Sequence, residues 1–206
     1  MKRGFTLIEI MAVITILGII GVIAVVAVDK TVKDNNERLY KAQLSNIEDA
    51  ARTWGHKNIK YLPDNLDEAI SIPLVLLKKE GLIDKNIKNS KTGELFFDDM
   101  YIDITYQNGI YSYTVADNSG SKNLDSLDTP VIIFKNVLNP ALTLDEEFED
   151  GALLILRDGT VVDIETDDSY VNIDSKVVPN RTGEYDYTIT VTDGKSFTVN
   201  RKITIK

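Results

Sequence analysis

An uncharged segment near the amino terminus constrains this chain more than any other feature. Residues 10–28 carry no charged side chain, and nearly all of them are large apolar residues or alanine. At 1.5 Å per residue the segment makes roughly 28 Å of helix, close to the hydrocarbon thickness of a bilayer. One carboxylate, Glu9, lies immediately before it, where a charge is costly. The sequence therefore predicts a transmembrane helix over residues 5–28 with an acidic group near its start.

The flanking residues predict how this helix is oriented. Lys2 and Arg3 precede the apolar segment, and basic residues favour the cytoplasmic side. A cleaved secretory signal peptide is the competing interpretation. However, "AVVA" at residues 24–27 is a poor cleavage context, and no turn signal follows it. We therefore expect a single-pass precursor in the cytoplasmic membrane with its amino terminus inside.

The helical pattern continues beyond the apolar segment. Apolar residues recur at spacings of four and three on one helical face, at Tyr40, Leu44, Ile47, Ala51 and Trp54. No proline occurs before Pro63, and Gly55 is a candidate C-cap. The pattern predicts one helix from about Phe5 to Trp54, apolar all round in its first half and amphipathic in its second.

Charge and cysteine content exclude several kinds of site. The net charge of -9 disfavours an extended nucleic-acid surface, because phosphates would have to approach a negative body. The chain has no cysteine, so it can form no disulfide, thiolate metal site or cysteine nucleophile. Its stability must come from packing.

The first nine residues carry a resemblance to a known family. The stretch "KRGFTLIE", followed by an unbroken apolar run, resembles the class III signal of type IV pilins and pseudopilins. The resemblance implies that residues 1–4 are a leader peptide recognised through Lys2 and Arg3. It also implies that a prepilin peptidase cuts after Gly4 and methylates the new amino terminus at Phe5. Residues 5–54 would then be the pilin helix.

Two features depart from common pilin patterns. Many members carry a proline midway along the apolar segment, where this chain has Val25 and Val26. Many pilins of Gram-negative bacteria close a C-terminal loop with a disulfide, which a chain without cysteine cannot do. Together with a composition rich in lysine, asparagine and isoleucine, this favours a Gram-positive source.

The resemblance also implies a partner for Glu9. A carboxylate inside a hydrocarbon layer is usually neutralised or paired. Cleavage after Gly4 creates a positive amino group on Phe5, and in pilins Glu9 of an incoming subunit would meet this group on its neighbour. Such a pair sets the register of assembly, because the unpaired alternatives are costly. The same pair can form within one subunit, about one helical turn apart, and both alternatives stay open.

Residues 55–117 are expected to form a small α/β head. Residues 63–65 can start a short helix, and Gly81 can end another. Apolar and aromatic residues flank Asn108-Gly109, which is a strong hairpin signal. With the preceding "ELFF", this hairpin predicts a three-stranded antiparallel sheet against the amphipathic part of the long helix.

The remaining sequence predicts a second unit. Residues 118–129 are rich in small and polar residues and are expected to form a linker. Residues 130–206 contain many short strand patterns, the last two around Asp193-Gly194, which predicts a β-sandwich. The segments "DTPVI", "DGTVVDIE" and "GEYDYTITVTDGKSFTVNRKITI" resemble bacterial Ig-like domains. The expected fold class is α+β, with a long N-terminal pilin helix packed on a small antiparallel β-sheet and followed by an Ig-like β-sandwich.

The sequence shows no catalytic motif and no metal-ligand spacing. His56, the one histidine, lies at the expected helix end, where capping or exposure explains it. Two acidic groups could supply oxygen ligands to Ca²⁺, but neither has EF-hand spacing, so solvated loops are the preferred interpretation. These groups are Asp98, Asp99 and Asp103, and Glu165, Asp167, Asp168 and Asp174. The second is the better candidate, at Asp167, Asp168 and Asp174, because it joins two strands. We expect no metal, no cofactor and no enzyme activity.

These observations predict a structural subunit of a type IV pilus that polymerises through its N-terminal helix. It would act as a major subunit or as a minor, adhesive one, in a filament of the kind used for cell adhesion and twitching motility. The expected partners are other pilin subunits, the prepilin peptidase and the assembly platform in the cytoplasmic membrane. The expected destination is an extracellular filament. No nucleic acid is expected along the shaft, and a surface ligand is left open.

Two other interpretations remain. The first is a pseudopilin of a type II secretion or DNA-uptake system, with the same assembly but a short filament. The second is a membrane-anchored surface-binding protein that never polymerises and uses its Ig-like part to hold a ligand.

Overall fold

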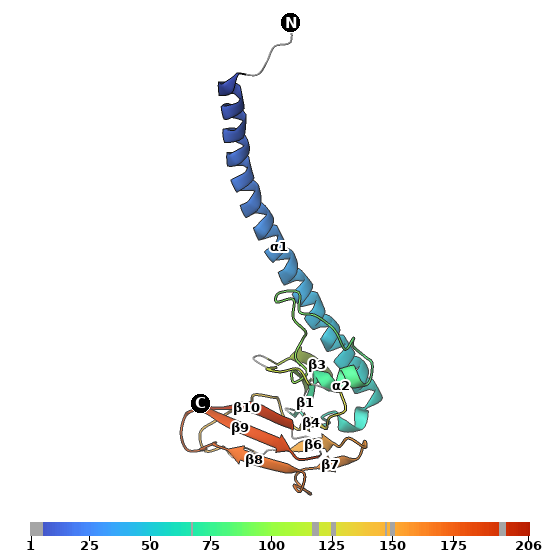
Figure 1. The fold of residues 1–206 in the computed structure, drawn as a ribbon. Helices are drawn as coiled ribbons and strands as arrows, with labels where there is room; N and C mark the ends of the chain where they lie inside the picture. Colours follow the sequence, from blue (N-terminus) through green and yellow to red (C-terminus); the bar gives the residue numbers. More distant parts are fainter. Residues whose placement is uncertain are drawn as a thin grey trace.

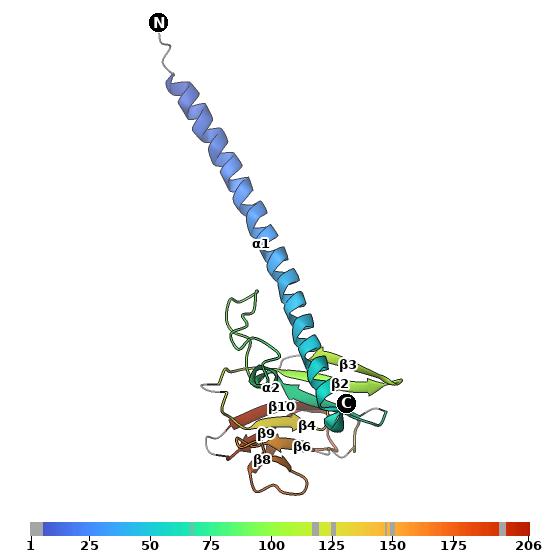
Figure 2. The same cartoon turned by 90° about the vertical axis from the view of Figure 1, so that its right-hand side faces the viewer.

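A helix of 51 residues, α1 (Leu7–Lys57), projects from a head made of two β-sheets (Figure 1). The computed structural model describes residues 6–66, 68–116, 120–124, 127–146, 148, 151–193 and 197–206, and of residues 23–27 it describes the backbone only. The head gathers around the carboxyl-terminal end of α1, and the helix extends away from it as a stalk (Figure 2). The predicted long helix is therefore confirmed within the described residues.

The carboxyl-terminal end of α1 differs from the prediction. The helix continues to Lys57, and the backbone N–H of Asn58 donates to the carbonyl of Gly55 at 3.1 Å. Gly55 is thus not the C-cap but a residue of the last turns. A Cβ atom at this position would lie 2.6 Å from the hydroxyl of Tyr113. Glycine is used here because it lets α1 approach β3 (Ile110–Val115) closely.

The amphipathic half of α1 packs as its spacing predicts. Ile47, Ala51 and Trp54 are fully buried in a core between the helix and the first sheet. Trp54 also donates from its indole nitrogen to Glu80, just after the short helix α2 (Leu74–Lys79), at 3.0 Å. Burying an indole requires a partner for its N–H, and Glu80 supplies it.

The first sheet has six strands in the order β3-β2-β1-β4-β6-β7, and all its neighbouring strands are antiparallel. Its members besides β3 are β1 (Ala69–Pro73), β2 (Tyr101–Gln107), β4 (Val131–Phe134), β6 (Ala152–Ile155) and β7 (Val161–Asp163). The predicted hairpin is confirmed, since Asn108 and Gly109 join β2 to β3 with φ values of 52° and 80°. Both residues of a two-residue type I′ turn need such positive φ values.

The third strand of the predicted small sheet was assigned wrongly. The strand beside β2 is β1, whereas "ELFF" contributes only an isolated bridge between Lys88 and Leu95. The chain leaves α1 through a 3-10 turn, η1 (Ile59–Tyr61). Residues 63–65 follow this turn, form no helix and lead by a bend toward β1. The cause is packing, because Ile70 and Ile72 alternate into the core beneath α1. Gly81 does follow a helix, as predicted, with a φ of 69°.

The second sheet has four strands in the order β5-β10-β9-β8. These are β5 (Ala141–Leu142), β8 (Val171–Ser175), β9 (Gly183–Val191) and β10 (Phe197–Ile205). β9 and β10 form the predicted antiparallel pair, although Gly194 lies outside the described residues. The two sheets pack face to face around a second apolar core, so the β-sandwich prediction is confirmed. β6 is a strand that the sequence analysis missed.

β4 belongs to both cores. Its side chains alternate, with Val131 and Ile133 facing α1 and with Ile132 and Phe134 facing the second sheet. All four are at most 1% exposed, as expected for a strand covered on both faces. Since β4 pairs with β1, one sheet continues across the predicted linker. The assignment of residues 55–117, 118–129 and 130–206 as head, linker and separate Ig-like domain stays a prediction.

Candidate functional site

The start of α1 is built around Glu9. Thr6 is the N-cap residue, and the backbone N–H of Glu9 donates to its hydroxyl at 3.3 Å. In return, Oε2 of Glu9 accepts from the backbone N–H of Thr6 at 2.7 Å and from its hydroxyl at 2.8 Å. This reciprocal pair is a capping box, which satisfies N–H groups that the first turn cannot bond internally.

The capping box is a role for Glu9 that the sequence analysis missed. The signal was present, because "TLIE" at residues 6–9 matches the pattern in which a threonine is followed three residues later by glutamate. Both contacts fall on Oε2, and within the described residues Oε1 of Glu9 accepts no hydrogen bond. One oxygen of an exposed carboxylate is therefore left for a further donor at the tip of the helix.

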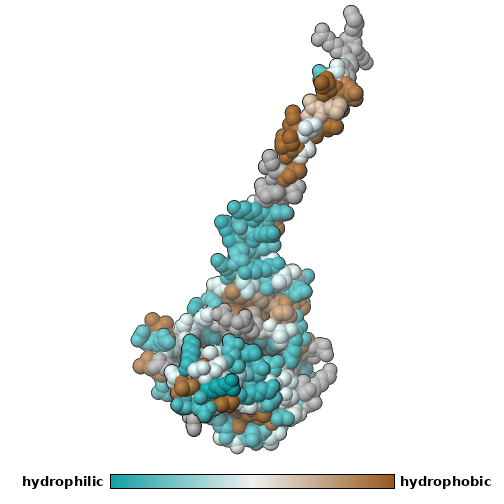
Figure 3. Space-filling view, turned by 90° about the vertical axis from the view of Figure 1, so that its left-hand side faces the viewer, coloured by the Kyte–Doolittle hydropathy of each residue, from teal (hydrophilic) through white to brown (hydrophobic). Residues whose placement is uncertain are grey.

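The helix beyond this cap presents an apolar surface on all sides. Between Leu7 and Val22 the large apolar side chains are at least half exposed, and Leu7 reaches 77%. Figure 3 shows this apolar surface on the outer part of the stalk, with a polar zone between it and the head. Isolated apolar residues on a surface are ordinary, but a continuous apolar sleeve requires a covering partner or lipid.

The structure describes only part of the predicted membrane span. In the part of the chain that the structure describes, we find no helix with an apolar stretch of the length needed to cross a membrane. The span predicted over residues 5–28 includes Phe5 and the side chains of residues 23–27, which lie outside that description. Lys2, Arg3 and Gly4 also lie outside it, so leader recognition, cleavage and methylation stay predictions.

A loop of the head supports α1 above the core. The hydroxyl of Ser90 donates to the carbonyl of Asn36 at 2.9 Å, and its backbone N–H donates to Gln43 at 3.0 Å. Lys91 lies 2.7 Å from the carboxylate of Glu37 and 4.2 Å from the ring centre of Tyr40. The Lys91 hydrogen bond lowers the pKa of Glu37. The head therefore holds α1 as far up as Asn36, and the apolar part projects beyond that point.

The first acidic group holds the head together. Asp98 is buried and pairs with Lys78 at 2.7 Å, while its other oxygen accepts from the backbone N–H of Leu124 at 2.8 Å. Asp99 accepts three hydrogen bonds from Ser121 and Lys122 at 2.7 to 2.9 Å. Both carboxylates thus hold residues 121–124 of the predicted linker against the turn that precedes β2.

Asp103 has a similar structural role. It accepts from the hydroxyl of Ser71 and from the backbone N–H of Leu138, the latter at 2.9 Å. Ser71 lies on β1, whereas Leu138 follows β4, so this carboxylate ties together segments from either side of residues 118–129.

The second acidic group lies in turns and on an exposed strand. Asp167 accepts from the backbone N–H of Ser169 at 3.0 Å, which closes a local turn. Hydrogen bonding by the side chain of Ser169, and then by its backbone, lowers the pKa of the Asp167 carboxyl. Asp168 follows it in the chain, and Asp174 is exposed on β8. Among all described residues, no three acidic or histidine side chains gather closely enough to hold a metal ion. His56 is exposed in the last turn of α1.

Comparison with known proteins bears on the amino terminus alone. The prokaryotic N-terminal methylation motif matches residues 1–25 of this chain. The chain therefore carries a class III signal of the kind found on type IV pilins and pseudopilins, as the stretch "KRGFTLIE" predicted. No protein of curated function matches the chain. The resemblance of residues 130–206 to Ig-like domains stays a prediction.

Proposed function

We propose that this chain, with its pilin-type methylation signal, is a structural subunit of a type IV pilus and not an enzyme. The observation that carries the proposal is the form of α1. The signal-bearing helix projects from the head with its apolar side chains exposed and a carboxylate at its tip. A surface of this kind is covered by lipid in a stored precursor and by the helices of other subunits in a filament.

Glu9 is the residue on which assembly is proposed to depend. Cleavage after Gly4 would create the ammonium of Phe5 close to the cap, and Oε1 of Glu9 accepts no bond from any described residue. The ammonium of Phe5 in the same subunit or in a neighbour would take this oxygen. In a low dielectric such a pair selects one register strongly, even when its net stabilisation is small.

The test separates the charge of Glu9 from its capping role. In the native host, Glu9→Leu removes both, whereas Thr6→Val removes the capping hydroxyl and keeps the carboxylate. We expect both variants to be cleaved and inserted, as checked by mass spectrometry of the membrane fraction. We expect only Glu9→Leu to be missing from filaments sheared from the cells. Normal filament incorporation of Glu9→Leu, or equal loss in both variants, contradicts the proposed register role.

The same signal occurs on pseudopilins, which form the second candidate. Immunogold labelling of this protein in electron micrographs distinguishes them, because a pilus is long and a pseudopilus is short. Dense labelling along the shaft indicates a major subunit, and labelling at the tip indicates a minor, adhesive one. Processed protein in the membrane without any labelled filament would instead support a non-polymerising anchor protein.

A further inference from the structure

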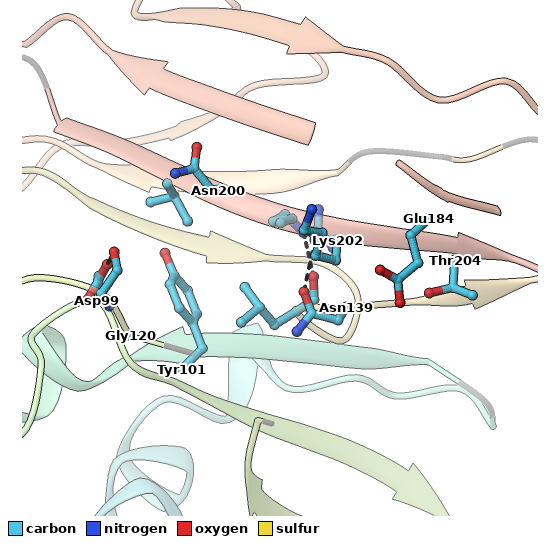
Figure 4. Close-up of a pocket in the computed structure, with 12 residues that line it drawn as sticks. Asp99, Tyr101, Gly120, Asn139, Glu184, Asn200, Lys202 and Thr204 are labelled. Atoms are coloured by element: carbon cyan, nitrogen blue, oxygen red, sulfur yellow. Dashed lines mark hydrogen bonds between the residues drawn. The ribbon is translucent and has the colours of Figure 1, made fainter. Parts of the chain in front are cut away.

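The two sheets of the head have a cavity between them beside β10, lined by residues near the start of β2 and by residues of β10, which we call the step. On the side of β10 away from β9, the strand β5 accompanies only Thr204 and Ile205. Nearer the start of β10, around Asn200, no described strand lies on that side. The cavity, of about 520 Å³, lies beside this open edge. Figure 4 shows Tyr101 rising from β2 toward β10 in this cavity, with Asp99 at one end and Glu184 at the other.

The backbone groups of Asn200 point into this step. On the same side of β10, the N–H of Lys202 donates to the side chain of Asn139 at 3.0 Å. Two residues before Asn200, the carbonyl of Thr198 accepts from Lys122 at 2.7 Å. Successive residues of a strand point their N–H and C=O groups to alternate sides, so Asn200 shares the direction of Thr198 and Lys202.

The carbonyl of Thr198 and the N–H of Lys202 have hydrogen-bond partners on this side, but the backbone groups of Asn200 have none among the described residues. Within the described residues, no group bonds to its backbone N–H or C=O. Lys122 and Asn139 therefore protect the two ends of the open edge, as side chains commonly do at exposed strands. Between them one donor and one acceptor remain open and point the same way.

This pair of groups selects an extended peptide among the possible ligands. One residue of an added strand presents an N–H and a C=O that point the same way, with the spacing of the pair on Asn200. A single trans amide cannot match both, because its N–H and C=O point in opposite directions. The apolar part of the cavity lining includes Leu138 and Val199, whose side chains are 3% and 4% exposed.

Charge indicates which peptide fits best. Two basic residues line the cavity, but Arg201 is buried against backbone carbonyls and Lys202 is paired with Asp186. Glu184 is exposed at one end of the cavity, where it attracts Lys202 without forming an ion pair with any described residue. The chain as a whole carries a net charge of -9, which attracts positively charged segments over a longer range. We propose that the open edge at Asn200 binds a short extended peptide segment with a basic side chain, which adds as a strand beside β10. This site lies in the head, away from the helix of the proposed assembly, and gives the protein a peptide partner of its own.

The first experiment uses hydrogen bonding as its readout. The full chain in detergent micelles is titrated with the synthetic peptide acetyl-Thr-Val-Lys-Val-Thr-amide, and backbone amide signals are followed by NMR. We expect saturable shifts centred on Asn200. Two N-methylated forms of this peptide, one modified at its threonines and lysine and the other at its two valines, lose donors on opposite edges of the peptide strand. Only one of them should bind at least tenfold more weakly. No saturable shift, or equal binding of both methylated peptides, overturns the proposal.

The second experiment changes the protein. Asn200→Pro removes the N–H that faces the cavity without breaking a hydrogen bond to β9, because that N–H points away from β9. Asn200→Thr keeps the N–H. We expect the proline variant to bind at least tenfold more weakly and the threonine variant to bind normally. Glu184→Gln should weaken the lysine peptide but not its norleucine counterpart. If the amide signals of β9 show that Asn200→Pro misfolds, the binding of the two methylated peptides to the unmodified protein still tests the proposal. Normal binding by a folded proline variant overturns the proposal.

Discussion

Ser71 of β1 lies opposite Phe134 of β4, and this pairing joins strands from either side of residues 118–129 into one sheet. The joint is reinforced, because the Ser71 hydroxyl proton is shared between the Asp103 carboxylate and the carbonyl oxygen of Asn136, which lies 2.8 Å away. On one face of this sheet lies α1 and on the other the second sheet. The helix and the second sheet are thus connected through a continuous layer.

The first prediction concerns the buried ion pair of this head. Lys78 is 1% exposed, and its ammonium bonds Asp98 at 2.7 Å and the carbonyl of Phe96 at 3.0 Å. Lys78→Ala leaves the Asp98 carboxylate buried without its cation. We expect a loss of about 3–5 kcal/mol in unfolding free energy, measured by chemical denaturation.

Lys85→Ala is the matched control for that change. It removes an exposed lysine close by in the same region of the chain, so we expect a change within about 0.5 kcal/mol. A Lys78→Ala variant as stable as Lys85→Ala would show that the buried pair does not matter.

The second prediction concerns the close approach at Gly55. Alanine is normally favoured over glycine inside a helix by about 1 kcal/mol. Here its Cβ would lie 2.6 Å from the hydroxyl of Tyr113, so Gly55→Ala should instead destabilise the protein by about 1–3 kcal/mol. In a Tyr113→Phe background the hydroxyl is gone, and Gly55→Ala should become neutral or stabilising. Thermal denaturation of the unmodified protein, the two single variants and the double variant measures this reversal, and the same loss in both backgrounds would refute the steric explanation.

The third prediction concerns the segment predicted as a linker. The three hydrogen bonds that Asp99 accepts hold Ser121 and Lys122 against the turn that precedes β2. Trypsin should therefore cut slowly after Lys122 in the native protein and rapidly in Asp99→Ala, because local opening precedes cleavage. Asp158→Ala is the control, since that carboxylate accepts from Thr160 within its own turn. Rapid cleavage of the unmodified protein at Lys122 would mean that the segment behaves as a free linker.

The fourth prediction concerns the loss of folding stability at low pH. A hydrogen bond from Arg157 at 2.8 Å, together with its positive charge, lowers the pKa of Asp128 below its ordinary value of 3.8. A lowered pKa in the folded state adds stability above the unfolded pKa, and that stability disappears as the pH falls through the folded value. Stability measured by urea denaturation should thus drop less steeply below the ordinary pKa in Asp128→Asn. Because both groups are exposed, the difference should be small and should shrink in high salt. An identical acid response in both proteins would contradict it.

Local patterns in the sequence were sufficient for some elements. The helical spacing of Ile47, Ala51 and Trp54 predicted the buried face of α1, and Asn108-Gly109 predicted the β2–β3 turn. These elements depend on neighbours a few residues apart, so periodicity and turn chemistry describe them well. The capping box at Thr6 and Glu9 is local too, and its pattern could have been found.

Other features depend on residues far apart in the sequence. Asp98, Asp99 and Asp103 looked like a loose acidic cluster, yet each satisfies donors that only the folded chain brings near. The same holds for β1. Its five residues gave too weak a strand pattern for it to be chosen over "ELFF" as the third strand of the predicted sheet.

The sequence by itself determined that the chain carries a pilin-type methylation signal on a long helix and ends in a β-rich head. Those properties depend on contiguous motifs and on patterns that repeat every few residues. Only the tertiary structure decided that β4 is shared by both cores, that Gly55 serves close packing, and that Asn200 faces an open step between sheets. Pairing between strands that are far apart in the sequence depends on which surfaces can be buried together, and a local sequence pattern does not predict it.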